Sequence, residues 1–278
     1  MQQKTSRQYR YSNTETRRVR NREAKANRAL LFLRTMIVIC VIAIAVFAVL
    51  LINNNREYSE GDAIYREIRS MLHNKSDEPE GTNAAISPPS DRSTGMDFTS
   101  LLAVNDDIVG WILAEGRSID YPVVRGEDNE YYLTRLFNNK KNKLGTLFVD
   151  YRNHDNFSDI NTVIYGHNMK DGSMFATLAE YKDQKYYESF PTMVLYTPDG
   201  DFTIELFAGI VADGNYEFVR FEFQDDGDFL EYISTLKEES TFESKTIVKP
   251  DDRIITLCTC SYEFNNARYA LFGKLIPL

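Results

Sequence analysis

Residues 253–260 read RIITLCTC, a β-branched and apolar run that ends in Cys260. An Asp pair precedes this run and the polar residues 261–267 follow it, so it predicts a β-strand with a thiol at its end. A second strand pattern, 269–276, comes directly after Arg268. If the two strands form a hairpin, Cys260 and Arg268 stand at the same end of neighbouring strands.

The strand pattern continues upstream through residues 96–278. Short β-branched or aromatic runs alternate with turn residues, and helical patches intervene at 98–104, 128–136, 173–180 and 225–238. Eight short strands with few helices favour a closed or nearly closed β-barrel over an alternating βαβ sheet. The expected strands are 108–113, 119–124, 146–149, 162–165, 192–197, 202–211, 253–260 and 269–276.

Three residues outside the apolar positions have the chemistry of a thiol-dependent site. Cys260 at a strand end is held on a rigid element, as a nucleophile requires. His167 follows the strand 162–165 and Gly166, and an imidazole near a thiol raises its thiolate fraction. The Arg268 guanidinium can donate forked hydrogen bonds to a developing oxyanion. Each residue taken alone is as consistent with an ordinary structural role.

The other cysteines and histidines give weaker signals. Cys40 lies in an apolar run, and Cys258 and Cys260 at i and i+2 on a strand are about 6–7 Å apart, which is poor for a disulfide. Two such cysteines and three scattered histidines do not make a zinc site, and no glycine-rich phosphate loop follows a strand. We therefore expect no metal and no cofactor.

The N-terminal part of the chain has the charge pattern of a membrane anchor. Residues 1–34 carry a balance of +8, whereas the remaining residues carry −17. Residues 35–52 are 18 positions without a charge, close to the length that spans a bilayer. Because Lys and Arg gather on the N-terminal side, we expect that side in the cytoplasm and the rest of the chain outside, and we assign no nucleic-acid role to the basic arm.

These patterns predict four segments along the chain. They are a basic cytoplasmic arm (1–29), a transmembrane anchor (30–52), a juxtamembrane helix with a linker rich in Pro, Ser and Gly (53–95), and a catalytic β-barrel (96–278).

At this point the residues resemble a known family, the sortases. Residues 256–260, Thr-Leu-Cys-Thr-Cys, are similar to the sortase signature Thr-Leu-x-Thr-Cys, and residues 165–169, Tyr-Gly-His-Asn-Met, are similar to the segment that carries the sortase histidine. The strand that opens at Arg268 looks like the one that carries the essential arginine of the family. Residues 150–153 and the helical patch 225–238 are most similar to class B sortases. Cys258 occupies the variable position of the signature, so we give it no catalytic role.

The resemblance implies a mechanism and partners. The Cys260 thiolate attacks the carbonyl of a Thr in a C-terminal sorting motif of a secreted protein, and His167 protonates the departing amine. A cell-wall precursor amine, lipid-linked, then displaces the thiolate, while Arg268 stabilises each oxyanion. Class B members typically favour motifs of the Asn-Pro-x-Thr type, but related enzymes accept Leu-Pro or Ser-Pro starts, so the motif stays open. Ser261, Tyr262 and Glu263 lie where members contact the sorting signal. The resemblance also implies a Gram-positive cell surface.

Three alternatives remain open from the sequence. A pilus-polymerising sortase uses a pilin lysine as the acceptor amine. A cysteine hydrolase releases its product to water, and a membrane-tethered binding barrel does not need the cysteine at all.

Overall fold

The computed structural model describes residues 2–73, 96–114, 119–214 and 219–278, so residues 74–95 of the expected linker lie outside the described part. Contacts divide the chain into two units, residues 1–56 and residues 57–278. The first unit is helical and belongs to α1 (Gln2–His73). Within Leu30–Met71 this helix has one stretch that is long and apolar enough to cross a membrane, and the side chains of that stretch are exposed.

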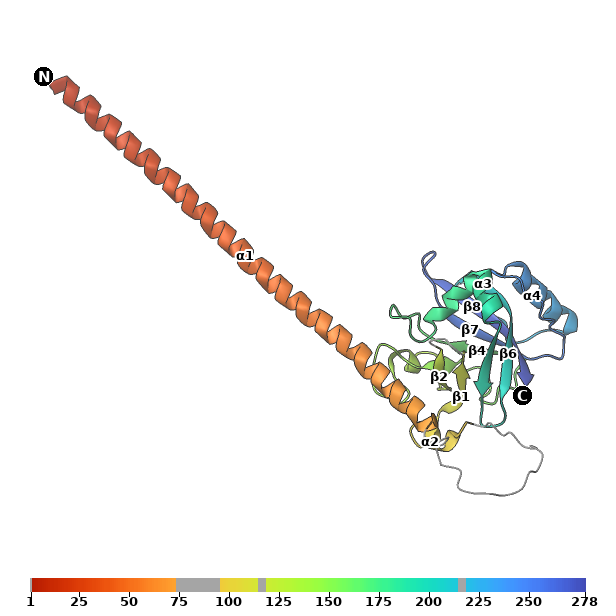
Figure 1. Ribbon diagram of the computed structural model, residues 1–278. Helices are drawn as coiled ribbons and strands as arrows, with labels where there is room; N and C mark the ends of the chain where they lie inside the picture. Colours follow the sequence, from red (N-terminus) through yellow and green to blue (C-terminus); the bar gives the residue numbers. More distant parts are fainter. Residues whose placement is uncertain (1, 74–95, 115–118, 215–218) are drawn as a thin grey trace. The chain divides into compact units, whose positions relative to one another are not determined.

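The second unit is built on a closed eight-stranded barrel (Figure 1). Its order is β1-β2-β3-β4-β7-β8-β6-β5, with parallel pairing between β2 and β3 and between β4 and β7 and antiparallel pairing elsewhere. The predicted barrel and its eight strands are therefore confirmed. The strands are β1 (Ile108–Leu113), β2 (Asp120–Val124), β3 (Leu147–Val149), β4 (Asn161–Tyr165), β5 (Thr192–Tyr196), β6 (Phe202–Asp213), β7 (Ile254–Cys260) and β8 (Ala267–Pro277).

Short helices join these strands. The expected patches correspond to α2 (Phe98–Leu102), the 3₁₀ helices η1 (Tyr131–Thr134) and η2 (Ala176–Lys182), and α4 (Asp226–Glu238). Asp225 caps α4 by accepting a hydrogen bond from the backbone N–H of Asp228. The helix α3 (Gln184–Ser189) was not predicted.

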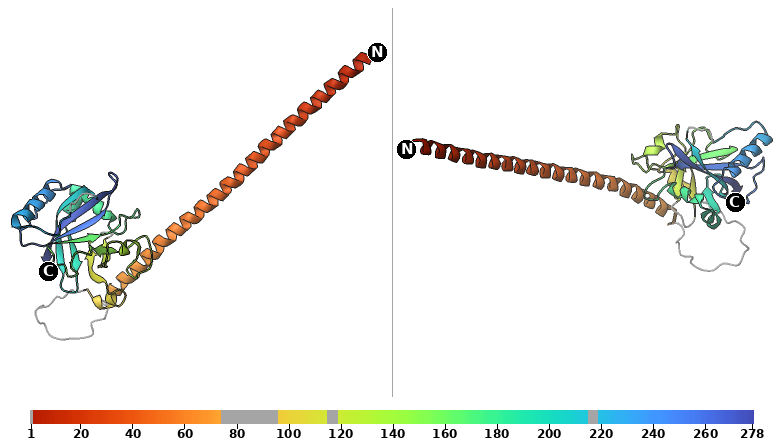
Figure 2. Two further views of the ribbon diagram at one scale, coloured as in Figure 1. Left: turned by 180° about the vertical axis from the view of Figure 1, so that it is seen from behind. Right: turned by 90° about the horizontal axis from the view of Figure 1, so that it is seen from above.

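The strands that carry the candidate site are buried on both faces. Leu257 and Leu271 belong to the core inside the barrel, whereas Ala270 and Phe272 belong to a second cluster with the apolar face of α4. Both views of Figure 2 show α4, in blue, against the outside of the barrel. Burial on both faces explains why β7 reads as an almost continuous apolar run and does not alternate.

The end of α1 packs with the barrel. Tyr65 is buried, and its hydroxyl donates to the carbonyl of Gly145 at 2.6 Å. Ile68 is also buried, and Arg69 pairs with Asp120 at 3.2 Å. The folded unit is therefore longer than the segment 96–278 that the sequence assigned to the barrel.

We predict that Ile68→Ala lowers the free energy of unfolding by about 2–5 kcal/mol, because the substitution leaves a cavity between helix and barrel. Urea unfolding of residues 57–278 measures this. Met71→Ala is the matched control, since Met71 lies on the same helix with 39% of its surface exposed and should change stability by about 0.5 kcal/mol at most. Equal effects of the two variants would mean that the helix does not pack on the barrel.

Candidate active site

Strand register brings the three predicted residues to one edge of the barrel. Cys260 ends β7 and is paired with Arg268 on the antiparallel strand β8. On its other side β7 runs parallel to β4, with Tyr165 paired to Cys258. His167 lies two residues beyond Tyr165, as Cys260 lies two residues beyond Cys258. The ends of β4 and β7 therefore place the backbone of His167 next to that of Cys260.

Hydrogen bonds keep the segment after β4 attached to β7. The Gly166 N–H donates to the carbonyl of Cys258 at 3.1 Å, and the Asn168 side chain donates to the carbonyl of Cys260 at 2.8 Å. The Thr259 hydroxyl donates to the carbonyl of Gly166 at 2.8 Å. His167 is thus held between two residues whose backbone position is fixed relative to Cys260.

A backbone carbonyl orients the imidazole. His167 Nε2 lies 2.6 Å from the carbonyl oxygen of Leu133 on η1. Because a carbonyl oxygen only accepts hydrogen bonds, Nε2 bears the hydrogen and donates a hydrogen bond to the Leu133 carbonyl. Nδ1 is the ring nitrogen that takes no part in this hydrogen bond. Sequence reasoning missed Leu133, since the group involved is main chain and any residue type supplies it.

The two cysteines of the barrel differ in their surroundings. Burial raises the pKa of the Cys258 thiol to about 12, although the Arg268 charge acts to lower it. Cys258 is therefore a neutral, unreactive thiol at neutral pH. Cys260 is partly exposed at the strand end. Because Arg268 is paired with Cys260, its side chain leaves β8 on the same face of the sheet as the two cysteine side chains.

Arg268 itself is partly buried, and its Nη1 donates to the carbonyl of Ala267 at 3.1 Å. The carbonyl of Ala267 also accepts from the backbone N–H of Ser261 at 2.8 Å. The arginine is thus attached to the turn that follows Cys260.

The three residues after Cys260 have different environments. Ser261 is buried, and its hydroxyl and the carboxylate of Glu263 both bind the ammonium of Lys182 on η2. Burial raises the pKa of Glu263, but the hydrogen bonds from Lys182 and Ser261 outweigh it and lower that pKa to about 2. Tyr262 is 73% exposed, and its hydroxyl donates to the carbonyl of Asn168 at 3.2 Å. Sequence analysis did not single out Lys182.

Within the described residues, no group of three His, Cys, Asp or Glu side chains is arranged to hold a metal ion.

A scan against models of protein families finds no match. Among curated proteins, sortase B of Listeria monocytogenes is 38% identical over 182 residues, which are 65% of this chain and 74% of the relative. Sortase B of Staphylococcus aureus is 32% identical over 183 residues, which are 65% of this chain and 75% of the relative. The chain belongs to the sortase B family.

Solved sortase B structures agree with this membership. A sortase B–substrate complex of S. aureus has a TM-score of 0.69 at 30% identity, covering 80% of this chain and 99% of that one. A mutant sortase B of Clostridium perfringens has a TM-score of 0.61 at 34% identity, covering 64% of this chain and 85% of that one. As a sortase, the chain is a cysteine transpeptidase.

Gly145 lies close to the His167 imidazole, and there is no room for a side chain at this position. Its φ is +62°, and a Cβ at this position would meet the carbonyl oxygens of Tyr132 and Leu133 at 2.7 and 2.8 Å and His167 Cδ2 at 3.1 Å. The Leu133 oxygen is the one that accepts from His167. A side chain here displaces both partners of that hydrogen bond.

We predict that Gly145→Ala costs about 1–3 kcal/mol more stability than Gly172→Ala and lowers activity on peptide substrates, because overpacking moves the Leu133 carbonyl. Gly172 is the matched control, since its φ is +85° but nothing lies within 4 Å of an added Cβ. Urea unfolding and peptide cleavage are the measurements. If the two variants lose equal stability and activity, the close approach at Gly145 has no role.

Proposed function

We propose that this chain cleaves a C-terminal sorting motif of a secreted protein after Thr, and joins the protein to a cell-wall precursor amine through a thioacyl intermediate on Cys260. One observation carries the proposal. The register of β4, β7 and β8 supports a site in which Cys260, His167 and Arg268 act on one substrate carbonyl.

In the first half of the reaction, the Cys260 thiol passes its proton to Nδ1 of His167, and the resulting thiolate attacks the carbonyl carbon of the Thr to form a C–S bond. The carbonyl oxygen takes the negative charge, and Arg268 donates hydrogen bonds to it. As the C–N bond breaks, the departing amine takes the proton from Nδ1 of His167, because Nε2 is occupied by Leu133.

In the second half, the acceptor amine attacks the thioester carbonyl and Nδ1 of His167 takes its proton. The C–S bond breaks and Cys260 leaves as a thiolate, which takes its proton back from Nδ1. The sequence of proton transfers returns the enzyme to its starting state and needs no metal or cofactor.

The residues proposed to contact the sorting signal lie at the same edge of the barrel, directly after Cys260. We propose, on the resemblance to sortases, that Ser261, Tyr262 and Glu263 form the segment that binds the sorting signal. Tyr262, with its exposed ring, is the best placed of the three, whereas Ser261 and Glu263 bind Lys182 and act by holding the loop.

The apolar stretch 30–52 of α1 is proposed as a single-pass membrane anchor with a cytoplasmic N-terminus, because the basic residues lie on its N-terminal side. The barrel then faces the outside of the membrane. This setting suits a lipid-linked precursor and secreted proteins as the two substrates.

We predict that residues 57–278 cleave a fluorogenic peptide with an Asn-Pro, Leu-Pro or Ser-Pro sorting motif after its Thr. Cys260→Ala should abolish cleavage, and His167→Ala should lower kcat/KM by about 10²–10⁴. Mass spectrometry should detect a thioacyl adduct on the wild type. Cys258→Ala is the control and should remain active.

The same assay separates the alternatives. A hydrolase gives no ligated product when an amine is added, and a pilus enzyme prefers a lysine side chain of a pilin. If folded protein cleaves none of the peptides and forms no adduct, the sorting function is refuted and a binding barrel becomes the better account.

We predict that Arg268→Lys lowers kcat by about 10²–10³, although it keeps the positive charge, because a single ammonium cannot reproduce the forked donors of guanidinium. Steady-state kinetics on the best peptide measure this. Arg253→Lys is the control, since Arg253 donates to the carbonyl of Phe157 at 2.9 Å, before the start of β7. Activity of Arg268→Lys within threefold of the wild type would exclude Arg268 as the oxyanion donor.

A further inference from the structure

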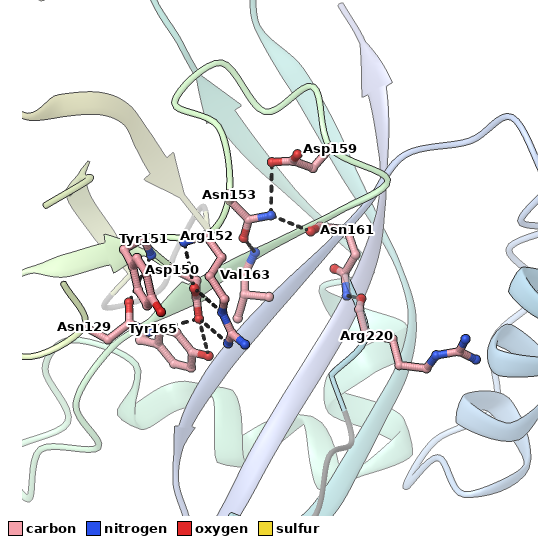
Figure 3. Close-up of polar contacts among 10 residues, drawn as sticks. All are labelled: Asn129, Asp150, Tyr151, Arg152, Asn153, Asp159, Asn161, Val163, Tyr165 and Arg220. Atoms are coloured by element: carbon pink, nitrogen blue, oxygen red, sulfur yellow. Dashed lines mark hydrogen bonds and ion pairs between the residues drawn. The ribbon is translucent and has the colours of Figure 1, made fainter. Parts of the chain in front are cut away.

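A buried carboxylate next to the site is not used by the mechanism above. Asp150 follows β3, its side chain has 0% exposure, and it accepts five hydrogen bonds (Figure 3). Oδ1 accepts from the backbone N–H of Arg152 at 3.0 Å and from Arg152 Nε at 2.9 Å. Oδ2 accepts from Arg152 Nη2 at 2.9 Å, from the Tyr165 hydroxyl at 3.0 Å and from the Asn129 amide at 3.0 Å.

Two of these donors belong to the two segments that hold His167. Tyr165 is the last residue of β4, two residues before His167. Asn129 lies two residues before η1, the helix whose Leu133 carbonyl accepts from His167 Nε2. Asp150 therefore accepts one side-chain hydrogen bond from the segment that carries His167 and one from the segment that leads into the helix of Leu133.

The Asp150 backbone is itself held in place. Its N–H donates to the carbonyl of Val163 at 2.9 Å, and its carbonyl accepts from the Asn153 N–H at 2.9 Å. The Asn153 side chain also binds β4, accepting from the Val163 N–H at 3.0 Å. Arg125 donates to the carbonyls of Tyr151 and Asn153 at 2.9 and 2.7 Å. A turn fixed to both β4 and the end of β2 is a rigid support.

The charge of Asp150 is balanced locally. The Arg152 guanidinium binds it in the bidentate fashion and stacks 4.1 Å from the centre of the Phe221 ring. Burial raises the pKa of Asp150, but the hydrogen bonds from Arg152 and Tyr165 outweigh it, so the carboxyl stays ionised. A buried ion pair is stable only when further donors satisfy the remaining lone pairs of the carboxylate. For Asp150 these donors are Tyr165 and Asn129, which belong to the two segments that hold His167.

We infer that Asp150 is a positioning residue for His167, which holds β4 and η1 at the separation that keeps Nε2 bonded to Leu133 and Nδ1 turned to the reacting atoms. The inference rests on the proposed role of His167 as the acid–base group. Asp150 does not touch the substrate in this scheme.

The test uses the full-length chain in detergent micelles, labelled with ¹⁵N at histidine. The chain has three histidines, and His167→Gln assigns the signals of the third. We expect the wild type to show His167 with the proton fixed on Nε2. Tyr165→Phe, which keeps the ring but removes the hydroxyl, should give a mixture of tautomers and lower kcat about ten- to hundredfold with little change in KM. Asp150→Asn should do the same more strongly.

Tyr187→Phe is the matched control. Its hydroxyl donates to Ser244 at 2.9 Å, and its ring stacks on Phe242, so it loses a comparable hydrogen bond that does not involve Asp150. We expect its His167 signals and kcat to equal those of the wild type. If Asp150→Asn does not fold, Tyr165→Phe decides the question.

The two proposals fail in different ways. Unchanged His167 signals in folded Tyr165→Phe overturn the positioning role of Asp150, whatever the activity. A wild type that cleaves no sorting peptide, yet whose tautomer changes in Tyr165→Phe, overturns the proposed function and leaves the positioning of His167 established.

Discussion

The parallel pairing of β4 with β7 is the constraint on which the site depends. Parallel strands end at the same edge of a sheet, so residues that follow β4 and residues that end β7 meet there although 93 positions separate His167 from Cys260. The antiparallel return of β8 then brings Arg268 to the same edge within eight positions. Any change that shifted the register of β7 by one residue would turn Cys260 to the opposite face of the sheet.

This arrangement requires a long crossover between β4 and β7. The described part of that crossover contains β5, β6 and α4, and it supplies the apolar layer that covers the outer face of β6, β7 and β8. Cys258 is deeply buried, whereas Cys260, two residues further along the same face, is partly exposed. The strand thus carries one inert thiol and one accessible thiol.

The sequence was sufficient for the parts of the molecule that leave a local signature. Strand patterns with turn residues predicted the barrel that the structure shows, and the residue types at strand ends made Cys260, His167 and Arg268 the candidate site. Burial by distant segments leaves no such signature. The stretch 150–159 is polar and its pattern gives no sign of burial, yet Asp150 is fully buried, and two of the five hydrogen bonds that it accepts come from Tyr165 and Asn129 in other parts of the fold. The sequence predicted the juxtamembrane helix before the linker, but its packing becomes visible only in the fold, where the Tyr65 hydroxyl donates to the carbonyl of Gly145.

The Leu133 carbonyl is the clearest case of a functional group that has no sequence signal, and its chemistry suits a residue that must gain and lose a proton. A carbonyl accepts from Nε2–H in both the neutral and the protonated imidazole, so this hydrogen bond persists through both halves of the proposed reaction. A positively charged imidazole strengthens the bond, because charge-assisted hydrogen bonds are stronger than neutral ones. The ring therefore keeps one orientation while Nδ1 alone exchanges the proton, and the site does not have to reorganise between acylation and transfer to the amine.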